Sequence, residues 1–216
     1  MKFAVVLAGC GVYDGAEIQE AVSTLLAIDK NGGTYQIFAP NVMQHHVIDH
    51  LTGAEMKESR NVLVEAARIA RGKISQLIDY RVADFDALVF PGGFGVAKNL
   101  CSYAIDGVGM KIDKVVEKVV RETHASGKPI GALCISPVLI TRILGKVEVT
   151  IGDDHSTSID IQAMGGKHTE TKSGEIVIDI KNKIVTSPCY MLDATISEIA
   201  LGAENTVKAL IELAKA

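Results

Sequence analysis

The stretch PIGALCISP, residues 129–137, predicts a buried strand that ends at Cys134 and turns directly into a helix. It opens on an apolar run, as expected for a strand buried on both faces of a parallel sheet. Pro137 suits the first turn of a helix, because its missing N–H costs no hydrogen bond there. The residues two places from the cysteine are the small Ala132 and Ser136, and a sharp strand–nucleophile–helix turn leaves no room there for larger side chains. The stretch therefore predicts a nucleophile elbow with Cys134 at its tip.

The chemistry expected at this elbow is that of a reactive thiol. The N-terminus of the following helix favours the thiolate form of Cys134, which is the nucleophilic form. The alternative is a buried structural cysteine, the commoner role of a single cysteine. The small flanking residues and the strand–cysteine–helix context favour the reactive thiol. The other cysteines, Cys10, Cys101 and Cys189, are interpreted as packing or secondary redox residues.

Strands and helices alternate along the rest of the chain. Apolar runs predict strands, the last two forming a hairpin, at residues 2–8, 34–39, 85–90, 129–133, 147–151, 175–180 and 184–187. Helical spacing of apolar residues predicts helices at 18–30, 62–71, 112–126, 137–144 and 196–211. In the first helix the apolar positions are Ile18, Ala21, Val22, Leu25 and Leu26. This alternation predicts an α/β three-layer sandwich, a mostly parallel open sheet with helices on both faces.

The polar, histidine-rich segment 41–61 interrupts the alternation and is expected to leave the sheet. The sequence shows no internal repeat, no low-complexity tract and no linker. We therefore expect a single domain over residues 1–216.

Composition and charge exclude several functional classes. The chain has 216 residues, with 22 basic against 26 acidic, and a net charge of −4. A nucleic-acid surface needs clustered Lys and Arg and is not expected, and no segment approaches the ~20 apolar residues of a membrane span. The four cysteines form no CxxC pair and no zinc spacing, which indicates a reduced, cytoplasmic chain. Residues 7–10, LAGC, imitate a lipoprotein cleavage box, but the preceding apolar stretch is shorter than the roughly 7–15 residues required.

Ligands of open parallel sheets bind beyond the carboxyl ends of the strands. Three loops are expected there, at residues 9–17, 91–95 and 133–137. In the first loop, Glu17 begins a helix and is expected to partner Cys134, whereas alone it would indicate an exposed glutamate that complements the helix dipole. The second loop, PGGFG, can present unobstructed backbone N–H groups. We expect an oxyanion hole formed by Gly92 or Gly93 together with Ile135.

No cofactor and no metal is expected. The glycine-rich turn at residues 9–15 resembles a dinucleotide fingerprint, but the third glycine of that motif should fall at Asp14. His46 and His50 stand four residues apart and would share a helix face, as many zinc pairs do. The surrounding segment lacks an HExxH glutamate and is not convincingly helical, which argues against a metal site.

These motifs together carry a resemblance. VVLAGCGVYDGAEIQE (5–20), PGGFGVAKNL (91–100) and ALCISP (132–137) resemble the PfpI/ThiJ superfamily, and most closely its ElbB branch of enhancing-lycopene-biosynthesis, or isoprenoid-biosynthesis amidotransferase-like, proteins. The resemblance extends over essentially the whole chain and implies a flavodoxin-like, class I glutamine amidotransferase-like fold. It also implies a reactive Cys134 with Glu17 as companion carboxylate. Cofactor-independent glyoxalase activity, which turns glyoxal into glycolate, and a homodimer are further implications.

The chain departs from glutamine amidotransferases in its histidines. Those enzymes use a cysteine with a His-x-Glu pair, and the triplet at 168–170 lies before the terminal hairpin rather than directly before the last helix. We interpret it as coincidental and expect no glutamine amidotransferase activity. His155, just past a predicted strand end, is the best candidate for a catalytic histidine. The alternative is a solvated loop histidine.

The leading hypothesis is a cytoplasmic, cysteine-dependent lyase of the glyoxalase type that acts on small 1,2-dicarbonyls. Cys134 would form a hemithioacetal, and Glu17 would exchange protons with the thiol and the substrate. The main alternative is a redox-sensing or regulatory binding protein of isoprenoid or carbonyl-stress metabolism, in which Cys134 is reversibly oxidised. A third interpretation, deglycation or proteolysis, needs a cleft for larger substrates.

Overall fold

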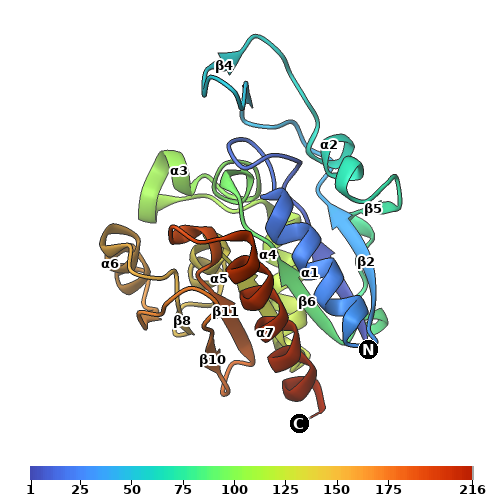
Figure 1. Cartoon of the computed structure of the whole chain (residues 1–216), viewed down its shortest axis with the longest axis vertical. Helices are drawn as coiled ribbons and strands as arrows, with labels where there is room; N and C mark the ends of the chain where they lie inside the picture. Colours follow the sequence, from blue (N-terminus) through green and yellow to red (C-terminus); the bar gives the residue numbers. More distant parts are fainter. Residues whose placement is uncertain (216) are drawn as a thin grey trace.

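A seven-stranded sheet forms the centre of the computed structural model, which describes residues 1–215 (Figure 1). The strand order is β10-β11-β7-β6-β1-β2-β5. These strands are β1 Lys2–Val6, β2 Thr34–Ala39, β5 Ile74–Gln76, β6 Ala87–Phe90, β7 Ile130–Leu133, β10 Val177–Asp179 and β11 Ile184–Ser187. The pair β10 and β11 is antiparallel, and the other neighbouring pairs are parallel. The predicted mostly parallel open sheet is confirmed.

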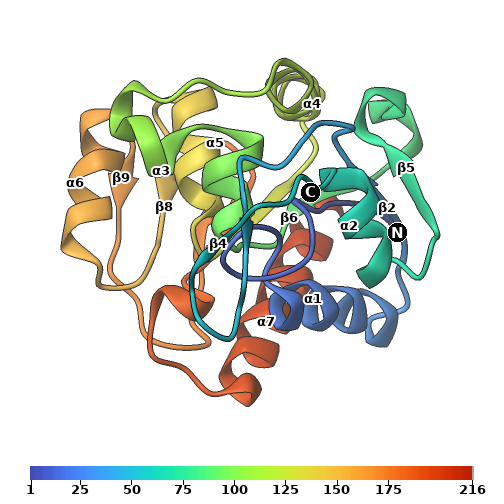
Figure 2. The same cartoon turned by 90° about the horizontal axis from the view of Figure 1, so that it is seen from above.

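Helices cover both faces of this sheet, as the view from above shows (Figure 2). They are α1 Ile18–Lys30, α2 Val62–Ile69, α3 Tyr103–Asp106, α4 Lys114–Ala125, α5 Ser136–Leu144, α6 His155–Ala163 and α7 Ile196–Lys215. Phe3 and Val5 of β1 pack in the core under α1, α2 and α7, while Ala4 and Val6 pack under α4, α5 and α6. Successive residues of a strand point to opposite faces, so β1 is buried on both sides and needs no polar alternation. The predicted three-layer α/β sandwich is confirmed.

The buried face of α1 differs from the face that its apolar pattern indicates. Ile18, Val22 and Leu26 are 44%, 49% and 52% exposed. The buried residues of this helix are Glu20, Ala21, Thr24, Ala27 and Ile28. The small side chains on that face let α1 pack closely beside α7 (Figure 1), so the longer aliphatic side chains turn outward. This rotation carries the carboxyl group of Glu20 into the interior.

Several segments lie outside the central sheet. The segment 41–61 leaves it as predicted and forms a hairpin of β3 Val47–Ile48 and β4 Glu55–Met56 (Figure 1). The strand predicted at 147–151 is β8 Glu148–Val149, which pairs with β9 Lys167–His168 in a separate two-stranded sheet. The sequence predicts neither β5 nor α6, because β5 has only three residues and α6 buries mainly Thr and Ser.

Short helical turns complete the chain. They are 3-10 turns at Leu77–Asp79, Val82–Asp84, Gly107–Gly109 and Cys189–Met191, and a π-helical turn at Val96–Leu100. Within residues 1–215, none of the helices is both long enough and apolar enough to cross a lipid bilayer.

Candidate active site

Cys134 lies at the carboxyl end of the central strand β7, where the chain turns into α5. Its backbone has φ +58°, a left-handed conformation that is uncommon for residues other than glycine and typical of a tight turn. The N–H of Cys134 donates to the carbonyl of Ser187, at the end of the neighbouring strand β11, at 3.0 Å. The side chain is 7% exposed. This local geometry agrees with a strand–nucleophile–helix elbow.

The carboxyl group beside Cys134 belongs to Glu20 on α1. Its Oε2 accepts a hydrogen bond from the N–H of Gly92 at 2.8 Å, and its Oε1 accepts one from the N–H of Tyr190 at 3.2 Å. This carboxyl group lies beside the thiol of Cys134, since a Cβ added to Gly92 would lie 2.7 Å from the Oε2 of Glu20 and 2.9 Å from the Sγ of Cys134. Glu20 is completely buried, and because burial destabilises the charged carboxylate, its pKa rises to about 7. Near neutral pH this group can therefore either hold or accept a proton.

Glu17, expected from the sequence to partner Cys134, has a different role in the structure. It is the N-cap of α1, and its Oε2 accepts the N–H of Glu20 at 2.6 Å. A capping carboxylate satisfies a free N–H of the first helical turn, so Glu17 stabilises the helix that carries Glu20. Burial raises the pKa of Glu17 above its usual value. The structure brings Glu20, three residues further along the chain, to the thiol.

The turn that follows β6 supplies the backbone groups around the thiol. Gly92 has no space for a side chain, since a Cβ there would lie 2.3 Å from the Cβ of Cys134. Its N–H is bound to Glu20 and is not free to stabilise an oxyanion. The N–H groups of Gly93 and Ile135 are directed at the Cys134 sulfur, and neither donates to an oxygen acceptor among residues 1–215. Of the predicted oxyanion-hole groups, these two amides are available for an anion.

The thiol of Cys134 does not ionise easily in this environment. Burial raises its pKa well above the usual value, and the negative charge of Glu20 adds to the rise. The amides of Gly93 and Ile135 act in the opposite direction. Because Glu20 lies beside the thiol, the ionisation of each group affects that of the other. Glu20 is therefore the acceptor available to take the thiol proton.

A cavity of about 340 Å³ opens onto the thiol. The residues that line it are Val12, Gly93, Phe94, Ala97, Tyr103, Ala104, Cys134, Ile135, Asp154, Ser156, Thr157, Tyr190 and Met191. Most of these side chains are apolar or aromatic, and within the described chain no Lys or Arg lines the cavity. The chamber suits a small, uncharged ligand better than an anion.

The predicted catalytic histidine is not part of this cavity. His155 is the exposed first residue of α6, and its neighbours Asp154 and Ser156 line the cavity while His155 does not. The other candidate, His168, lies on β9, where its Nε2 accepts the N–H of Ile151 at 3.3 Å. Among residues 1–215, no histidine lines the chamber around Cys134. The structure therefore brings together Cys134, Glu20 and two amides, without an imidazole.

Comparison with known proteins shows the family of this chain. The DJ-1/PfpI family matches residues 10–191. The chain belongs to the DJ-1/PfpI family. It is 47% identical to the human mitochondrial "glutamine amidotransferase-like class 1 domain-containing protein 3" over 98% of this chain and 83% of the relative.

Two solved structures resemble this DJ-1/PfpI chain. An isoprenoid biosynthesis protein with an amidotransferase-like domain from Ehrlichia chaffeensis superposes with a TM-score of 0.93 at 40% identity, over 99% of each chain. Glyoxalase III from Candida albicans superposes with a TM-score of 0.63 at 15% identity, over 99% of this chain and 97% of the other. The second likeness concerns the fold alone.

The histidine-rich excursion of the DJ-1/PfpI chain is used for packing. The Nε2 of His50 accepts the N–H of Tyr13 at 3.2 Å, and its Nδ1 is 3.0 Å from the carbonyl of Ile48. The Nε2 of His46 is 3.0 Å from the Nζ of Lys98. Both rings are thus engaged, and no group of three or more His, Cys, Asp or Glu side chains within residues 1–215 is arranged to hold a metal ion.

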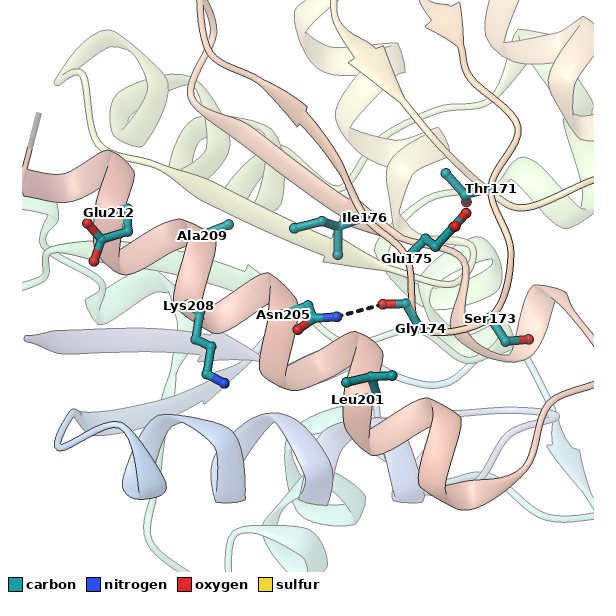
Figure 3. Close-up of a pocket in the computed structure, with 10 residues that line it drawn as sticks. All are labelled: Thr171, Ser173, Gly174, Glu175, Ile176, Leu201, Asn205, Lys208, Ala209 and Glu212. Atoms are coloured by element: carbon teal, nitrogen blue, oxygen red, sulfur yellow. Dashed lines mark hydrogen bonds between the residues drawn. The ribbon is translucent and has the colours of Figure 1, made fainter.

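A larger hollow lies elsewhere on the DJ-1/PfpI fold. Figure 3 shows a groove of about 680 Å³ between the loop before β10 and the outer side of α7. There the Nδ2 of Asn205 donates to the carbonyl of Gly174 at 2.9 Å, and the Nζ of Lys208 pairs with Glu204 at 2.7 Å. No cysteine lines this groove in the described chain. Its polar groups bind one another or face solvent, so it offers no reactive group.

Glu20 and Tyr190 are the site residues that sequence reasoning missed. A signal for Glu20 exists, because it shares a helix face with Thr24 and Ala27 at a spacing of four and seven residues. An ionisable residue on the small-residue face of a helix indicates a buried charge. Tyr190 lies on the 3-10 turn after β11, and no local pattern indicates its approach to Glu20.

Proposed function

We propose that this DJ-1/PfpI protein is a cofactor-independent glyoxalase of the lyase class that converts glyoxal and similar small, uncharged 1,2-dicarbonyls into 2-hydroxy acids. The observation that carries the proposal is the adjacent pair of Cys134 and Glu20, the latter buried and with a pKa of about 7, at the end of a 340 Å³ cavity. A buried carboxyl group that titrates near neutral pH is suited to repeated proton transfer.

The first step is capture of the aldehyde by the thiol. Glu20 takes the proton of Cys134 while the sulfur attacks one carbonyl carbon, and it then returns this proton to the alkoxide oxygen, which gives a hemithioacetal and leaves Glu20 as a carboxylate. The negative charge that develops on the carbonyl oxygen is stabilised by the N–H groups of Gly93 and Ile135, which have no other acceptor among the described residues. No charge needs to enter the cavity from solvent, because the proton moves between two groups already in contact.

The second step moves a proton between the two substrate carbons. A base removes the proton from the carbon bonded to sulfur, and the resulting enediol receives a proton on the neighbouring carbon. The sulfur-bearing carbon is thereby oxidised to a thioester while its neighbour is reduced to an alcohol, so no external electron carrier is needed. Water then hydrolyses the thioester, which releases glycolate and returns the thiol. Glu20 is the carboxyl group in contact with Cys134 and serves as this base and acid.

The cavity supports the choice of substrate. Its wall of Phe94, Ile135 and Met191 favours apolar or uncharged molecules, and the absence of a lining Lys or Arg within residues 1–215 disfavours carboxylates and phosphates. The Candida protein named glyoxalase III shares only the fold, so the proposal depends on the site of this chain rather than on that likeness.

Two further expectations from the sequence remain proposals. The homodimer is one, and gel filtration with light scattering tests it. The cytoplasmic location is the other, whereas the human relative is named as mitochondrial. Fractionation of cells that produce the full natural protein distinguishes these locations.

The proposed activity is tested with glyoxal as the only addition. Purified protein, first dialysed against a chelator, is incubated with glyoxal without thiols or nucleotides, and products are followed by proton NMR. We expect glycolate to accumulate over many turnovers in proportion to the enzyme. Absence of glycolate, combined with stoichiometric oxidation of Cys134 by peroxide that a thiol reductant reverses, would overturn the proposal in favour of the redox-sensing alternative.

A further inference from the structure

A second cysteine, Cys189, lies behind the elbow and has no role in the proposed reaction. Strands β7 and β11 are parallel neighbours with Leu133 opposite Ser187, so both cysteines follow the carboxyl ends of adjacent strands. The N–H of Cys134 donates to the carbonyl of Ser187 at 3.0 Å, and the two thiols are close enough for each to influence the ionisation of the other. Both side chains belong to one buried cluster, completed by Leu133, Ile199 and Ala203.

The two thiols differ in access to solvent. Cys134 lines the 340 Å³ cavity. Cys189 is 2% exposed and does not line it. A small oxidant that enters the cavity therefore meets Cys134 first, and Cys189 is shielded from it by the elbow.

We propose that Cys189 is a resolving cysteine, which forms a reversible disulfide with Cys134 after a hydroperoxide has oxidised Cys134. This proposal is independent of the glyoxalase activity, because it uses a group that the reaction does not. The chain then contains a pair of thiols that responds to hydroperoxides, rather than a single oxidisable thiol.

Both steps balance without a further reactant. The Cys134 sulfur attacks the outer oxygen of the hydroperoxide, the O–O bond breaks, and sulfenic acid and an alcohol (or water, from hydrogen peroxide) form. The sulfur is oxidised by two electrons and the peroxide is reduced by two. The Cys189 sulfur then attacks the Cys134 sulfur, the S–O bond breaks, and the leaving hydroxide departs as water with the Cys189 proton. Glu20, whose charge acts on both thiols, can relay the Cys189 proton to that hydroxide.

The other cysteines are poorly situated for this role. Cys101 is also buried, but it packs in the core on the opposite face of the sheet, and its thiol donates to the carbonyl of Val96 at 3.3 Å. Cys10 is half-buried, close to the charges of Glu65 and Arg68 rather than to the elbow. Cys101 therefore provides a matched control, since it is also buried but neither lines the cavity nor belongs to the cluster of Cys134 and Cys189.

The test is peroxide treatment of the intact protein followed by peptide mapping without reduction. With about one equivalent of hydrogen peroxide, we expect the peptide containing Cys134 to be crosslinked to the peptide containing Cys189, and dithiothreitol to reverse the crosslink. In Cys189→Ser, the sulfenic acid cannot be resolved, so dimedone labelling of Cys134 should rise several-fold above wild type. Cys101→Ser should label as wild type does.

Two results would overturn the proposal. One is wild-type protein that accumulates sulfinic acid at Cys134 without a Cys134–Cys189 crosslink, an outcome that needs no variant and so does not depend on how Cys189→Ser folds. The other is equal dimedone labelling of Cys134 in wild type and in folded Cys189→Ser. Glyoxal turnover is measured in parallel on the reduced protein. Failure of the disulfide proposal and failure of the glyoxalase proposal can therefore be distinguished.

Discussion

The cavity at Cys134 and the groove beside α7 are two hollows of very different character. The groove is about 680 Å³, twice the cavity's 340 Å³. Its side chains, however, are partnered at the surface. Lys208 pairs with Glu204, and Asn205 donates to the carbonyl of Gly174 (Figure 3). The smaller cavity ends at the buried thiol of Cys134, which lies beside the buried carboxyl group of Glu20.

This difference shows that a perturbed environment, rather than volume, marks the reactive site. A carboxyl group taken out of water costs free energy unless it is protonated or hydrogen-bonded. Glu20 meets this cost with two backbone N–H donors and with a pKa of about 7. A buried carboxyl group of this kind lowers the stability of the fold. It lies at the Cys134 cavity and not at the groove beside α7.

Replacing the buried carboxyl group of Glu20 is expected to have the largest effect on glyoxal turnover at the cavity. Glu20→Gln removes the proton acceptor of Cys134 and should lower kcat/KM for glyoxal by about 10²–10⁴-fold. Glu17→Gln is the matched control, because its amide oxygen can still cap α1 and its rate should fall by less than about tenfold. Steady-state assays of both variants decide the matter. A larger loss of kcat/KM in Glu17→Gln than in Glu20→Gln would show that Glu17, the residue expected from the sequence, has the catalytic role.

The same carboxyl group predicts a pH dependence of stability. Its folded-state pKa of about 7 lies above the value of about 4.3 in an unfolded chain. Between these values the folded state keeps a proton that the unfolded state releases, so stability is full below pH ~4.3 and falls by about 4 kcal/mol in total as pH rises through 7.

Urea unfolding of wild type and Glu20→Gln at pH 5 and pH 8 measures this contribution. The variant carries no titrating group at residue 20, so its free energy of unfolding should gain about 3 kcal/mol relative to wild type between the two pH values. A difference between the proteins that does not change with pH would show that Glu20 is already ionised at pH 5.

Changes in the groove should have the smallest effect. Asn205→Ala removes the hydrogen bond to the carbonyl of Gly174 and should lower the free energy of unfolding by about 1 kcal/mol. Turnover of glyoxal should stay within about twofold of wild type, because the groove contains no group used in the reaction. A loss of activity larger than the loss in Glu20→Gln would reverse the ranking of the two hollows.

The elbow could be predicted from the sequence because its determinants are local. Ala132, Cys134, Ser136 and Pro137 specify a tight strand-to-helix turn whatever surrounds them. The alternation of strands and helices likewise predicted the three layers, since each apolar run needed a partner on its own face.

The carboxyl partner could not be predicted in the same way. Glu17 and Glu20 are one turn apart, and the choice between them depends on how α1 is rotated against the sheet and α7. The exposed Ile18 and Val22 suggest one buried face, while the small residues Ala21 and Thr24 form the real one. The close packing of α1 against α7 determines how α1 is rotated.

The histidine prediction shows the same limit. His155 follows the end of a predicted strand, so its position near the carboxyl-end edge of the sheet is correct. It begins α6, however, a helix without an apolar stripe, and its ring is exposed. Tyr190 reaches Glu20 through its backbone N–H, a contact that depends on the path of the 3-10 turn after β11. Contacts of this kind come from tertiary structure alone.

The most direct test of the central claim, that Cys134 is the nucleophile, is the initial rate of glycolate formation by Cys134→Ala relative to wild type. Cys101→Ala is the control, because it removes an equally buried thiol from the opposite side of the sheet. We predict a fall of about 10³-fold or more for Cys134→Ala, with Cys101→Ala within about tenfold of wild type. A Cys134→Ala rate within about tenfold of wild type would contradict the claim.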